Sequence, residues 1–266
     1  FGAAFGLEVP QWFAPDGTAD VFSWRRSVDF DHVGNEAKAV RNAVGLGDIS
    51  GFAKYEVSGS GAAAWLDQLL AAATPPIGRM TLAPMLKDDG KIIGDFSLSR
   101  LGDTRFLIIG SGIAESYHMR WFLSHLPDDG SVKVKSLGLD LVGLTIAGPK
   151  AREVLQKCCK TDISHDAMRF MAVREMDVGM IPAIVGRVSY SGDLGYEIWV
   201  KPASLLRLYD DLMAEGSDFD IRPFGARALN ALRLEKTFGS WGREYRPLYG
   251  PAWVWRELFV RHENTC

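Results

Sequence analysis

A strand–glycine–helix pattern that occurs twice is the feature that most limits the fold of this 266-residue chain. The first copy, YEVSGSGAAAWLDQL, begins at residue 55, and the second, LVGLTIAGPKAREVLQKC, covers residues 141–158. In each copy a short strand-like segment meets a glycine and is followed by apolar residues at helical spacing. This recurrence is typical of an internal duplication, and we expect two similar lobes over about residues 31–135 and 136–251.

The segments that follow each copy predict antiparallel sheets rather than βαβ units. Residues 80–112 alternate in polarity, and turns at KDDG and RLGDT predict a three-stranded meander. A strand pair is expected around SGDLG at residues 191–195. Helices are expected over residues 35–45, 60–72, 113–126 and 225–236, and after Pro202. The expected fold class is therefore α+β, with two lobes, each of an antiparallel sheet and helices, packed together.

Composition excludes several classes of partner. The 30 Lys and Arg against 33 Asp and Glu give a net charge of −3, which provides no electrostatic case for nucleic acid or an anionic membrane. No apolar run approaches the roughly 20 residues that span a bilayer. We expect a cytoplasmic protein, or one of the mitochondrial matrix if the source is eukaryotic. Residues 1–30, rich in aromatics, Pro and Gly, are expected to form an arm or linker.

Three other kinds of site are disfavoured. GSGAAA at 59–64 fits a dinucleotide fingerprint, but no acidic residue closes the next strand, so its glycines more simply allow a tight strand-to-helix turn. The five histidines form no chelating pair, so no metal site is expected. G-x-S-x-G is absent, and Cys158 and Cys159 are interpreted as core thiols.

Carboxylates and arginines in structured contexts remain as candidates. Glu197 lies among Tyr196, Ile198 and Trp199, where a buried carboxylate costs several kcal/mol unless a donor reaches it. Either Glu197 is on a solvated face, or a donor is brought to it. Asp95, on the predicted meander, is equally ambiguous, because a solvated edge strand would also explain it.

Several motifs resemble the folate-binding aminomethyltransferase family, which includes the glycine cleavage T-protein and the C-terminal part of dimethylglycine and sarcosine dehydrogenases. YSGDLGYEIWV resembles the family's Tyr-Thr-Gly-Glu-x-Gly-Phe/Tyr-Glu segment. GLGDISGFAKYEVSG, KDDGKIIGDFSLSRL and ARALNALRLEKTFGSWGREY resemble three further family segments. FGLEVPQWFAP and FGSWGREY are more similar to the dehydrogenase branch. The resemblance covers roughly residues 1–251.

The resemblance implies the family's folate-binding domain over residues 31–251, without its C-terminal β-barrel. Residues 252–266, AWVWRELFVRHENTC, depart from the family pattern and are interpreted as an atypical tail left by truncation or a frame change. No flavin fingerprint is found, so FAD is expected only on a missing segment or a partner. A flavin dehydrogenase domain is accordingly one partner that the resemblance allows.

The implied activity is one-carbon transfer from an amine resembling dimethylglycine or sarcosine to tetrahydrofolate, giving 5,10-methylenetetrahydrofolate. Carried over by position, the resemblance makes Asp95 the catalytic acidic residue beside the folate N5. It makes Glu197 the carboxylate that accepts hydrogen bonds from the pterin N–H groups. Tyr190 would line the slot, and Arg227, rather than Arg233, would contact the glutamate tail or the pocket wall. Asp95 and Glu197 are thus expected to reach one ligand from different lobes.

The expected activity is enzymatic, as part of a larger dehydrogenase. Two alternatives stay open from the residues alone. The chain could be a non-catalytic folate-binding or structural module left by truncation, or an aminomethyltransferase or demethylase of the T-protein kind.

Overall fold

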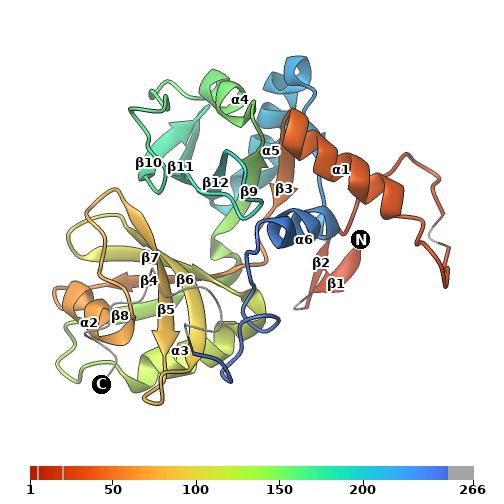
Figure 1. The fold of residues 1–266 in the computed structure, drawn as a ribbon. Helices are drawn as coiled ribbons and strands as arrows, with labels where there is room; N and C mark the ends of the chain where they lie inside the picture. The colour runs from red at the N-terminus through yellow and green to blue at the C-terminus, as the bar shows by residue number, and fades with distance from the viewer. Residues whose placement is uncertain (5, 20, 251–266) are drawn as a thin grey trace. The chain divides into compact units, whose positions relative to one another are not determined.

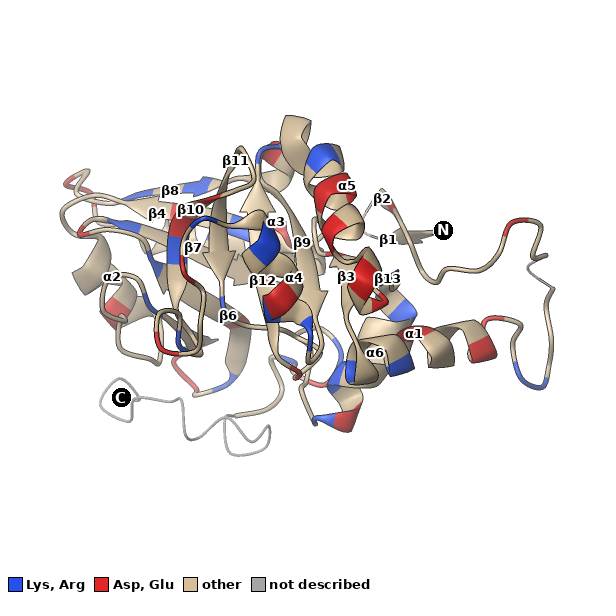
Figure 2. Ribbon diagram, turned by 90° about the horizontal axis from the view of Figure 1, so that it is seen from above, with Lys and Arg blue, Asp and Glu red and all other residues tan. Residues whose placement is uncertain are grey.

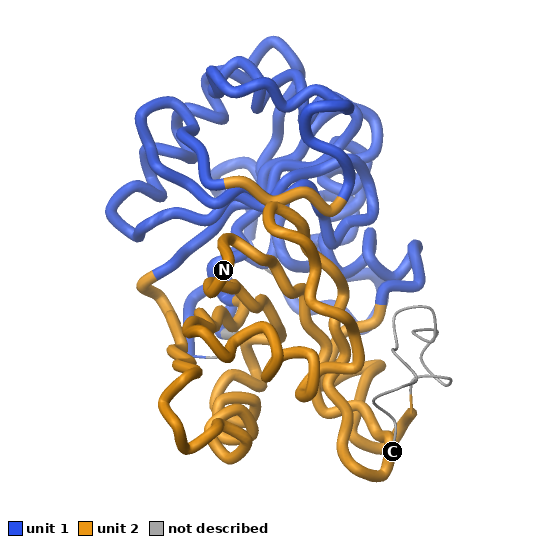
Figure 3. Tube along the Cα trace, turned by 90° about the vertical axis from the view of Figure 1, so that its left-hand side faces the viewer, with its two compact units in different colours: residues 1–51, 141–170, 175–238 blue, residues 52–140, 171–174, 239–266 orange. Residues whose placement is uncertain are grey.

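The computed structural model describes residues 1–4, 6–19 and 21–250, so the predicted tail at 252–266 lies outside the described residues. The chain forms two compact units, coloured in Figure 3. Unit 1 comprises residues 1–51, 141–170 and 175–238, and unit 2 comprises 52–140, 171–174 and 239–266. The units are interleaved along the chain, whereas the expected lobes 31–135 and 136–251 follow one another.

Unit 2 is built on an antiparallel sheet with two helices on one face (Figure 1). Its strands, in spatial order, are β5 (Met80–Leu86), β6 (Ile92–Arg100), β7 (Arg105–Gly110), β4 (Ala53–Ser58) and β8 (Lys133–Ser136). Helices α2 (Ala62–Leu69) and α3 (Glu115–Ser124) contribute Trp65 and Phe122 to a core shared with Tyr55 and Phe96. Because β5, β6 and β7 are consecutive antiparallel strands, the meander predicted over residues 80–112 is confirmed.

Unit 1 contains the second sheet and a small hairpin of β1 (Gly2–Ala4) and β2 (Leu7–Val9). The strands of the sheet, in order, are β10 (Val173–Val178), β11 (Ile181–Gly186), β12 (Gly195–Val200), β9 (Val142–Ala147), β3 (Gly45–Asp48) and β13 (Arg222–Pro223). The helices are α1 (Phe30–Asn42), α4 (Ala151–Cys158), α5 (Leu205–Glu215) and α6 (Ala226–Glu235). Short 3-10 turns in the two units cover Gly112–Ala114, Gly138–Asp140, Pro202–Ser204 and Ser217–Phe219.

Five strands of each sheet share one topology, and β13 is added beside β3 in unit 1 only. The shared topology confirms the duplication indicated by the sequence. The first repeat, residues 45–124, runs β3, β4, α2, β5, β6, β7, α3, and the second repeat, residues 133–215, runs β8, β9, α4, β10, β11, β12, α5. In each sheet the last three strands and the central strand follow the same spatial order, β5-β6-β7-β4 and β10-β11-β12-β9.

The two repeats exchange their first strands. β8 of the second repeat pairs antiparallel with β4 of the first, and β3 of the first repeat pairs antiparallel with β9 of the second. The registers correspond, because Ser58 pairs with Lys133 and Ala147 pairs with Gly45 at the same end of each central strand. Each sheet is therefore completed by sequence from the other repeat, which is why the compact units are interleaved.

One glycine in each repeat makes the strand-to-helix turn. Gly59 follows β4 with φ +124°, and Gly148 follows β9 with φ +129°. A Cβ on Gly59 would lie 2.1 Å from the Ser131 carbonyl oxygen, and one on Gly148 would lie 2.5 Å from the Ala43 carbonyl oxygen. Only glycine fits both the backbone conformation and the close approach. The glycine of GSGAAA thus serves the turn, as expected.

Helix boundaries differ from the expectations at several ends. The helix expected over residues 35–45 is α1, which begins at Phe30 and ends at Asn42, so Gly45 starts β3 instead of stopping the helix. The N-cap of α2 is Gly61, so this helix begins at Ala62, two residues after the start expected from the sequence. None of the helices in the described part of the chain is sufficiently long and apolar to cross a bilayer.

Candidate functional site

Glu197 lies in β12, the last strand of its repeat, on the sheet face away from α4 and α5. Its neighbours Tyr196 and Ile198 are fully buried, and the Tyr196 hydroxyl accepts a hydrogen bond from Arg152 Nε of α4 at 2.9 Å. Because side chains alternate along a strand, the Glu197 side chain leaves the opposite face of β12. The side chain is partly buried there. The carboxylate is therefore neither fully exposed to solvent nor part of the core beneath α4 and α5.

A row of residues paired across four neighbouring strands contains this carboxylate: Gly186 in β11, Glu197 in β12, Thr145 in β9 and Gly47 in β3. Directly paired residues point to the same face, so two glycines border the Glu197–Thr145 pair. At one end of this face, Val40 of α1 and Phe224, Ala228 and Leu232 pack on Ala147.

The side chain of Trp199 is one hydrogen-bond donor to the carboxylate. Trp199 lies two residues after Glu197 and on the same face, and its side chain donates a hydrogen bond to Glu197. The ring leans across β9, since a Cβ on Gly143 would lie 2.5 Å from Trp199 Cε3. The absence of a side chain at position 143 therefore leaves room for the indole over β9.

Burial raises the pKa of Glu197 to about 7, and the hydrogen bond from Trp199 offsets part of this rise. A carboxylate with one protein donor has further lone pairs available as acceptors. Trp199 is thus one donor brought to Glu197, which is one of the two alternatives that the sequence left open for this residue. The remaining acceptor capacity suits a ligand with N–H groups.

The first repeat contains leucine at the position of Glu197. Thr145 lies three residues before Gly148, as Glu56 lies three residues before Gly59. Glu197 pairs with Thr145, and Leu107 of β7 pairs with Glu56. Leu107 is 3% exposed. The shared topology accepts an apolar side chain at this position, so the fold does not require the carboxylate.

Asp95 belongs to the other unit, in β6, opposite Pro84 of β5. Phe96 and Leu98 belong to the core that includes Trp65 of α2 and Phe122 of α3. Asp95 and Ser97 therefore point to the opposite face of the sheet, and Asp95 is partly buried there. The two acidic residues come from different units, as expected. That they contact one ligand stays a prediction.

Tyr190 lies against the C-terminal end of α6. Its ring stacks on Phe238 with centroids 6.5 Å apart, and the Arg233 guanidinium lies 5.9 Å from the centre of the Tyr190 ring. Arg233 is 3% exposed and donates to Asn230 Oδ1 and to the Phe238 carbonyl oxygen. Arg233 is thus engaged in structural contacts, while the face of Tyr190 is fixed by its two neighbours.

Arg227 is engaged in an ion pair. Its Nη1 lies 2.5 Å from Asp29 Oδ2, just before α1, and the Arg227 side chain is 49% exposed. Burial acts to raise the pKa of Asp29, but hydrogen bonds from Arg227 and Ser27 and the charge of Arg227 hold it below its usual value. A role for Arg227 in binding a folate tail stays a prediction. In that role the guanidinium would have to contact the tail while it keeps its ion pair with Asp29.

The turn SGDLG, which precedes β12, is held by polar contacts. The Ser189 and Ser191 hydroxyls are 2.5 Å apart, and Gly192 takes φ +75°. Asp193 lies 3.4 Å from Arg41 Nε of α1 and 3.8 Å from Lys236 Nζ. These contacts fix the start of the strand that presents Glu197.

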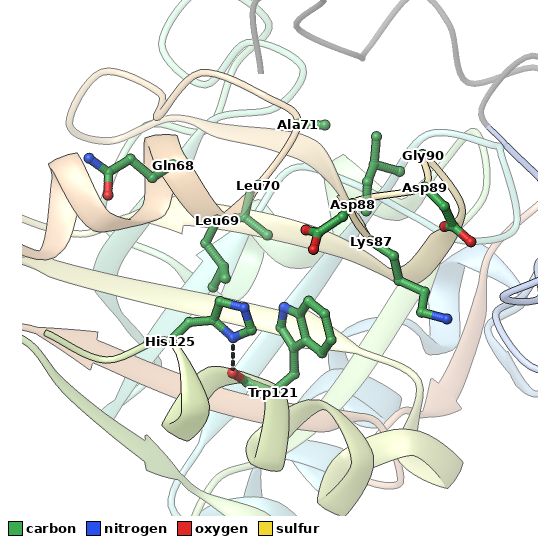
Figure 4. A pocket seen from close by; sticks show the side chains of 11 residues that line it. Gln68, Leu69, Leu70, Ala71, Lys87, Asp88, Asp89, Gly90, Trp121 and His125 are labelled. Carbon is green, nitrogen blue, oxygen red and sulfur yellow. Dashed lines mark hydrogen bonds between the residues drawn. The ribbon is translucent and has the colours of Figure 1, made fainter. Parts of the chain in front are cut away.

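Two surface hollows in the described residues have other linings. One of about 490 Å³ in unit 2 lies between the stacked rings of Trp121 and His125 and the turn at Lys87–Gly90 (Figure 4). The second, of about 390 Å³ in unit 1, is lined by Ile184 and Trp199 among others. Asp95, Glu197, Tyr190 and Arg227 line neither hollow, although the second is bordered by the indole that binds Glu197.

Other chemistry is weakly supported in residues 1–4, 6–19 and 21–250. These ranges contain no group of three or more His, Cys, Asp or Glu that could hold a metal ion. Burial raises the pKa of Cys158 to about 11 and of Cys159 to about 12, so both remain thiols at neutral pH. Acidic and basic residues are interspersed along the elements (Figure 2).

Two residues of this site were missed by the sequence analysis. Trp199 was noted only as an apolar neighbour of Glu197, although the alternation of side chains along a strand places both on one face. Thr145 carries no local signal, because its position beside Glu197 depends on the pairing of β9 with β12.

Comparison with known proteins supports a common origin with one-carbon enzymes. Residues 1–262 match the family model of the GCVT N-terminal domain. The mitochondrial dimethylglycine dehydrogenase of Homo sapiens is 34% identical over 259 residues, which are 96% of this chain and 30% of that protein. An aminomethyltransferase of Bacillus cytotoxicus is 30% identical over 231 residues, covering 85% of this chain and 62% of the relative. This chain therefore spans about a third of the human relative's length.

The fold agrees with a solved member of the same group. The crystal structure of glycine cleavage system aminomethyltransferase T from Bartonella henselae superposes with a TM-score of 0.79 at 23% identity, covering 96% of this chain and 64% of that one. The α+β class with antiparallel sheets, expected from the sequence, is thereby confirmed. With its first 262 residues matched by the family model, this chain belongs to the GCVT N-terminal domain family.

Proposed function

We propose that this chain binds tetrahydrofolate and takes part in one-carbon transfer from an amine resembling dimethylglycine or sarcosine, giving 5,10-methylenetetrahydrofolate. Family membership supports folate-dependent transfer, and the similarity to dimethylglycine dehydrogenase supports the class of amine. The chain spans 30% of that relative, so we assign the flavin-dependent oxidation of the amine to a missing segment or a partner.

The observation that carries the proposal is the placement of Glu197. It is a carboxylate at a position where the equivalent strand has leucine, bordered by Gly186 and Gly47 in its row. With one donor from Trp199, it can accept further hydrogen bonds from adjacent ring N–H and amino groups. The residues therefore fit a planar heterocycle of the pterin class.

The other proposed residues have more general roles. When bound, tetrahydrofolate supplies the nitrogen nucleophile that accepts the one-carbon unit. Asp95, as a carboxylate, stabilises positive charge near that nitrogen or moves a proton there. Tyr190 forms a wall of the slot, held by Phe238 and Arg233. Positioning of the reactants supplies much of the rate, and in favourable cases is worth ~7–11 kcal/mol.

The test is titration of the protein with tetrahydrofolate, followed by tryptophan fluorescence, for the wild type and Glu197→Gln. We expect a loss of ~1–3 kcal/mol in binding free energy for the variant, because the neutral amide replaces an acceptor-only carboxylate. Glu56→Gln is the matched control, since Glu56 is a sheet carboxylate with a side chain 42% exposed.

Three outcomes separate the alternatives. Wild-type protein that binds tetrahydrofolate, and turns over with formaldehyde or an amine donor, supports the enzyme. Binding without turnover identifies a folate-binding module. Equal titration of the wild type and Glu197→Gln contradicts the proposed site.

A further inference from the structure

Thr145 contains a buried hydroxyl that the fold leaves without a partner. The residue is 3% exposed in the centre of β9, and its Oγ1 has no hydrogen-bond partner among the described residues. Burying a hydroxyl in this way destabilises a fold, whereas valine would have nearly the same shape and no polar atom. The first repeat has Glu56 at this position, with a side chain 42% exposed and 3.7 Å from Arg105. The shared topology therefore does not explain the threonine.

The hydroxyl lies beside Glu197 rather than in an apolar region. Thr145 and Glu197 are directly paired across β9 and β12, so their Cβ atoms are about 4.5–5.5 Å apart on one face. Trp199 leans over Gly143, the next residue of β9 on the same face. Thr145, Glu197 and Trp199 therefore form one polar cluster, bordered by Gly47 and Gly186.

A hydroxyl can do what an ionised carboxylate cannot, because it donates one hydrogen bond and accepts two. A turn about χ1 between staggered rotamers moves Oγ1 without moving the strand. From this position it can donate to Glu197, as Trp199 does. Hydrogen bonds from both Thr145 and Trp199 would fix the orientation of the Glu197 carboxylate plane. The remaining lone pairs of the carboxylate would then be available to a ligand.

We propose that Thr145 is a positioning residue of the Glu197 site, whose hydroxyl donates to the Glu197 carboxylate when a planar heterocycle with adjacent N–H groups is bound. This inference rests on the proposed function, because it assumes that Glu197 is the ligand's acceptor. The unpaired hydroxyl of the ligand-free protein is then a group held ready for the complex.

The experiment compares Thr145→Val, which removes the hydroxyl at constant shape, with Thr145→Ser, which keeps it. Two quantities are measured: the denaturant midpoint without ligand, and the Kd for tetrahydrofolate. For Thr145→Val we expect an unchanged or higher midpoint together with a five- to twentyfold weaker Kd. For Thr145→Ser we expect a Kd within about twofold of the wild type.

A second pair of variants separates this inference from the proposed function. In a Glu197→Gln background, Thr145→Val should change the Kd by less than twofold, because the two residues act together. Wild-type affinity in Thr145→Val, or equal losses in the Val and Ser variants, overturns the role of the hydroxyl. If Glu197→Gln alone still binds normally, the proposed Glu197 site, on which the inference rests, fails as well. If Glu197→Gln weakens binding and Thr145→Val does not, only the inference about Thr145 fails.

Discussion

Glu197 of β12 and Leu107 of β7 occupy equivalent positions in the two repeats. Each lies in the last strand of its repeat. Glu197 pairs with Thr145 and Leu107 pairs with Glu56, and both partners lie three residues before the turn glycine of the central strand. One repeat thus fills this position with an apolar side chain and the other with a carboxylate whose pKa burial raises. The two copies of the sheet therefore differ at this position, and the shared topology does not require the carboxylate.

The stability of the ligand-free protein should fall as the pH rises from about 4.5 to above 7. Burial raises the pKa of Glu197 to about 7 in the folded state, so in this window the folded protein binds more protons than the unfolded chain. At about 1.4 kcal/mol per pKa unit, the decrease amounts to roughly 3 kcal/mol. Urea unfolding between pH 5 and 8 measures it, and Glu197→Leu should remove the decrease while abolishing folate binding. A Glu197→Leu variant with the wild-type pH slope would contradict the assignment.

His118 should have the opposite effect at acidic pH. The His118 side chain, on α3, is fully buried, and its Nε2 is 2.9 Å from the Ile93 carbonyl oxygen. Burial lowers the pKa of His118 to about 4, although the hydrogen bond to Ile93 acts in the opposite direction. Between pH 6.5 and 4 the unfolded chain binds the additional proton, so stability is lost as the pH falls, by about 3 kcal/mol over the shift. His118→Gln should flatten this acidic slope, while the exposed His125→Gln should leave it unchanged.

Asp95→Asn should reduce turnover by ~10²-fold or more and change the Kd for tetrahydrofolate by no more than a few-fold. The amide keeps the shape of the side chain, but it can neither carry a negative charge nor transfer a proton as a carboxyl group does. Single-turnover rates, measured with saturating folate, separate the chemical step from binding. Ser97→Ala, on the same face of β6, is the control, and near-wild-type turnover of Asp95→Asn would remove Asp95 from the chemistry.

Arg227→Met should destabilise the protein by about 1–3 kcal/mol, because it leaves the buried carboxylate of Asp29 without its main donor. The same variant tests the predicted contact with the folate tail. If Arg227 binds the tail, the variant should weaken the binding of tetrahydrofolate but not of tetrahydropterin, which lacks the tail. Equal effects on both ligands would assign Arg227 to the support of α1 and α6 alone.

The sequence was informative where the signal is local. Alternation and turn residues located the meander of β5, β6 and β7, and the recurring glycine located the turns at Gly59 and Gly148. The side-chain period of a strand also placed Trp199 on the face of Glu197, a relation that the sequence analysis did not use.

Long-range pairing was out of reach of such patterns. Thr145 becomes part of the site only because β9 lies beside β12, and Gly47 only because β3 joins the sheet of the other repeat. The sequence gives no sign of which partner Arg227 has, because Asp29 lies almost 200 residues earlier. These relations depend on which strands and helices become neighbours, and no local period specifies that choice.

The exchanged first strands have a consequence for how the chain is made. When only residues 1–127 have been synthesised, β9, the partner of β3, is not yet present. β8 is also not yet present, so one edge of β4 is unpaired. The backbone N–H and C=O groups at these strand edges therefore stay unpaired until the second repeat has been synthesised. The two halves should mature together, so that a nascent chain halted midway calls for chaperone protection rather than yielding a finished domain.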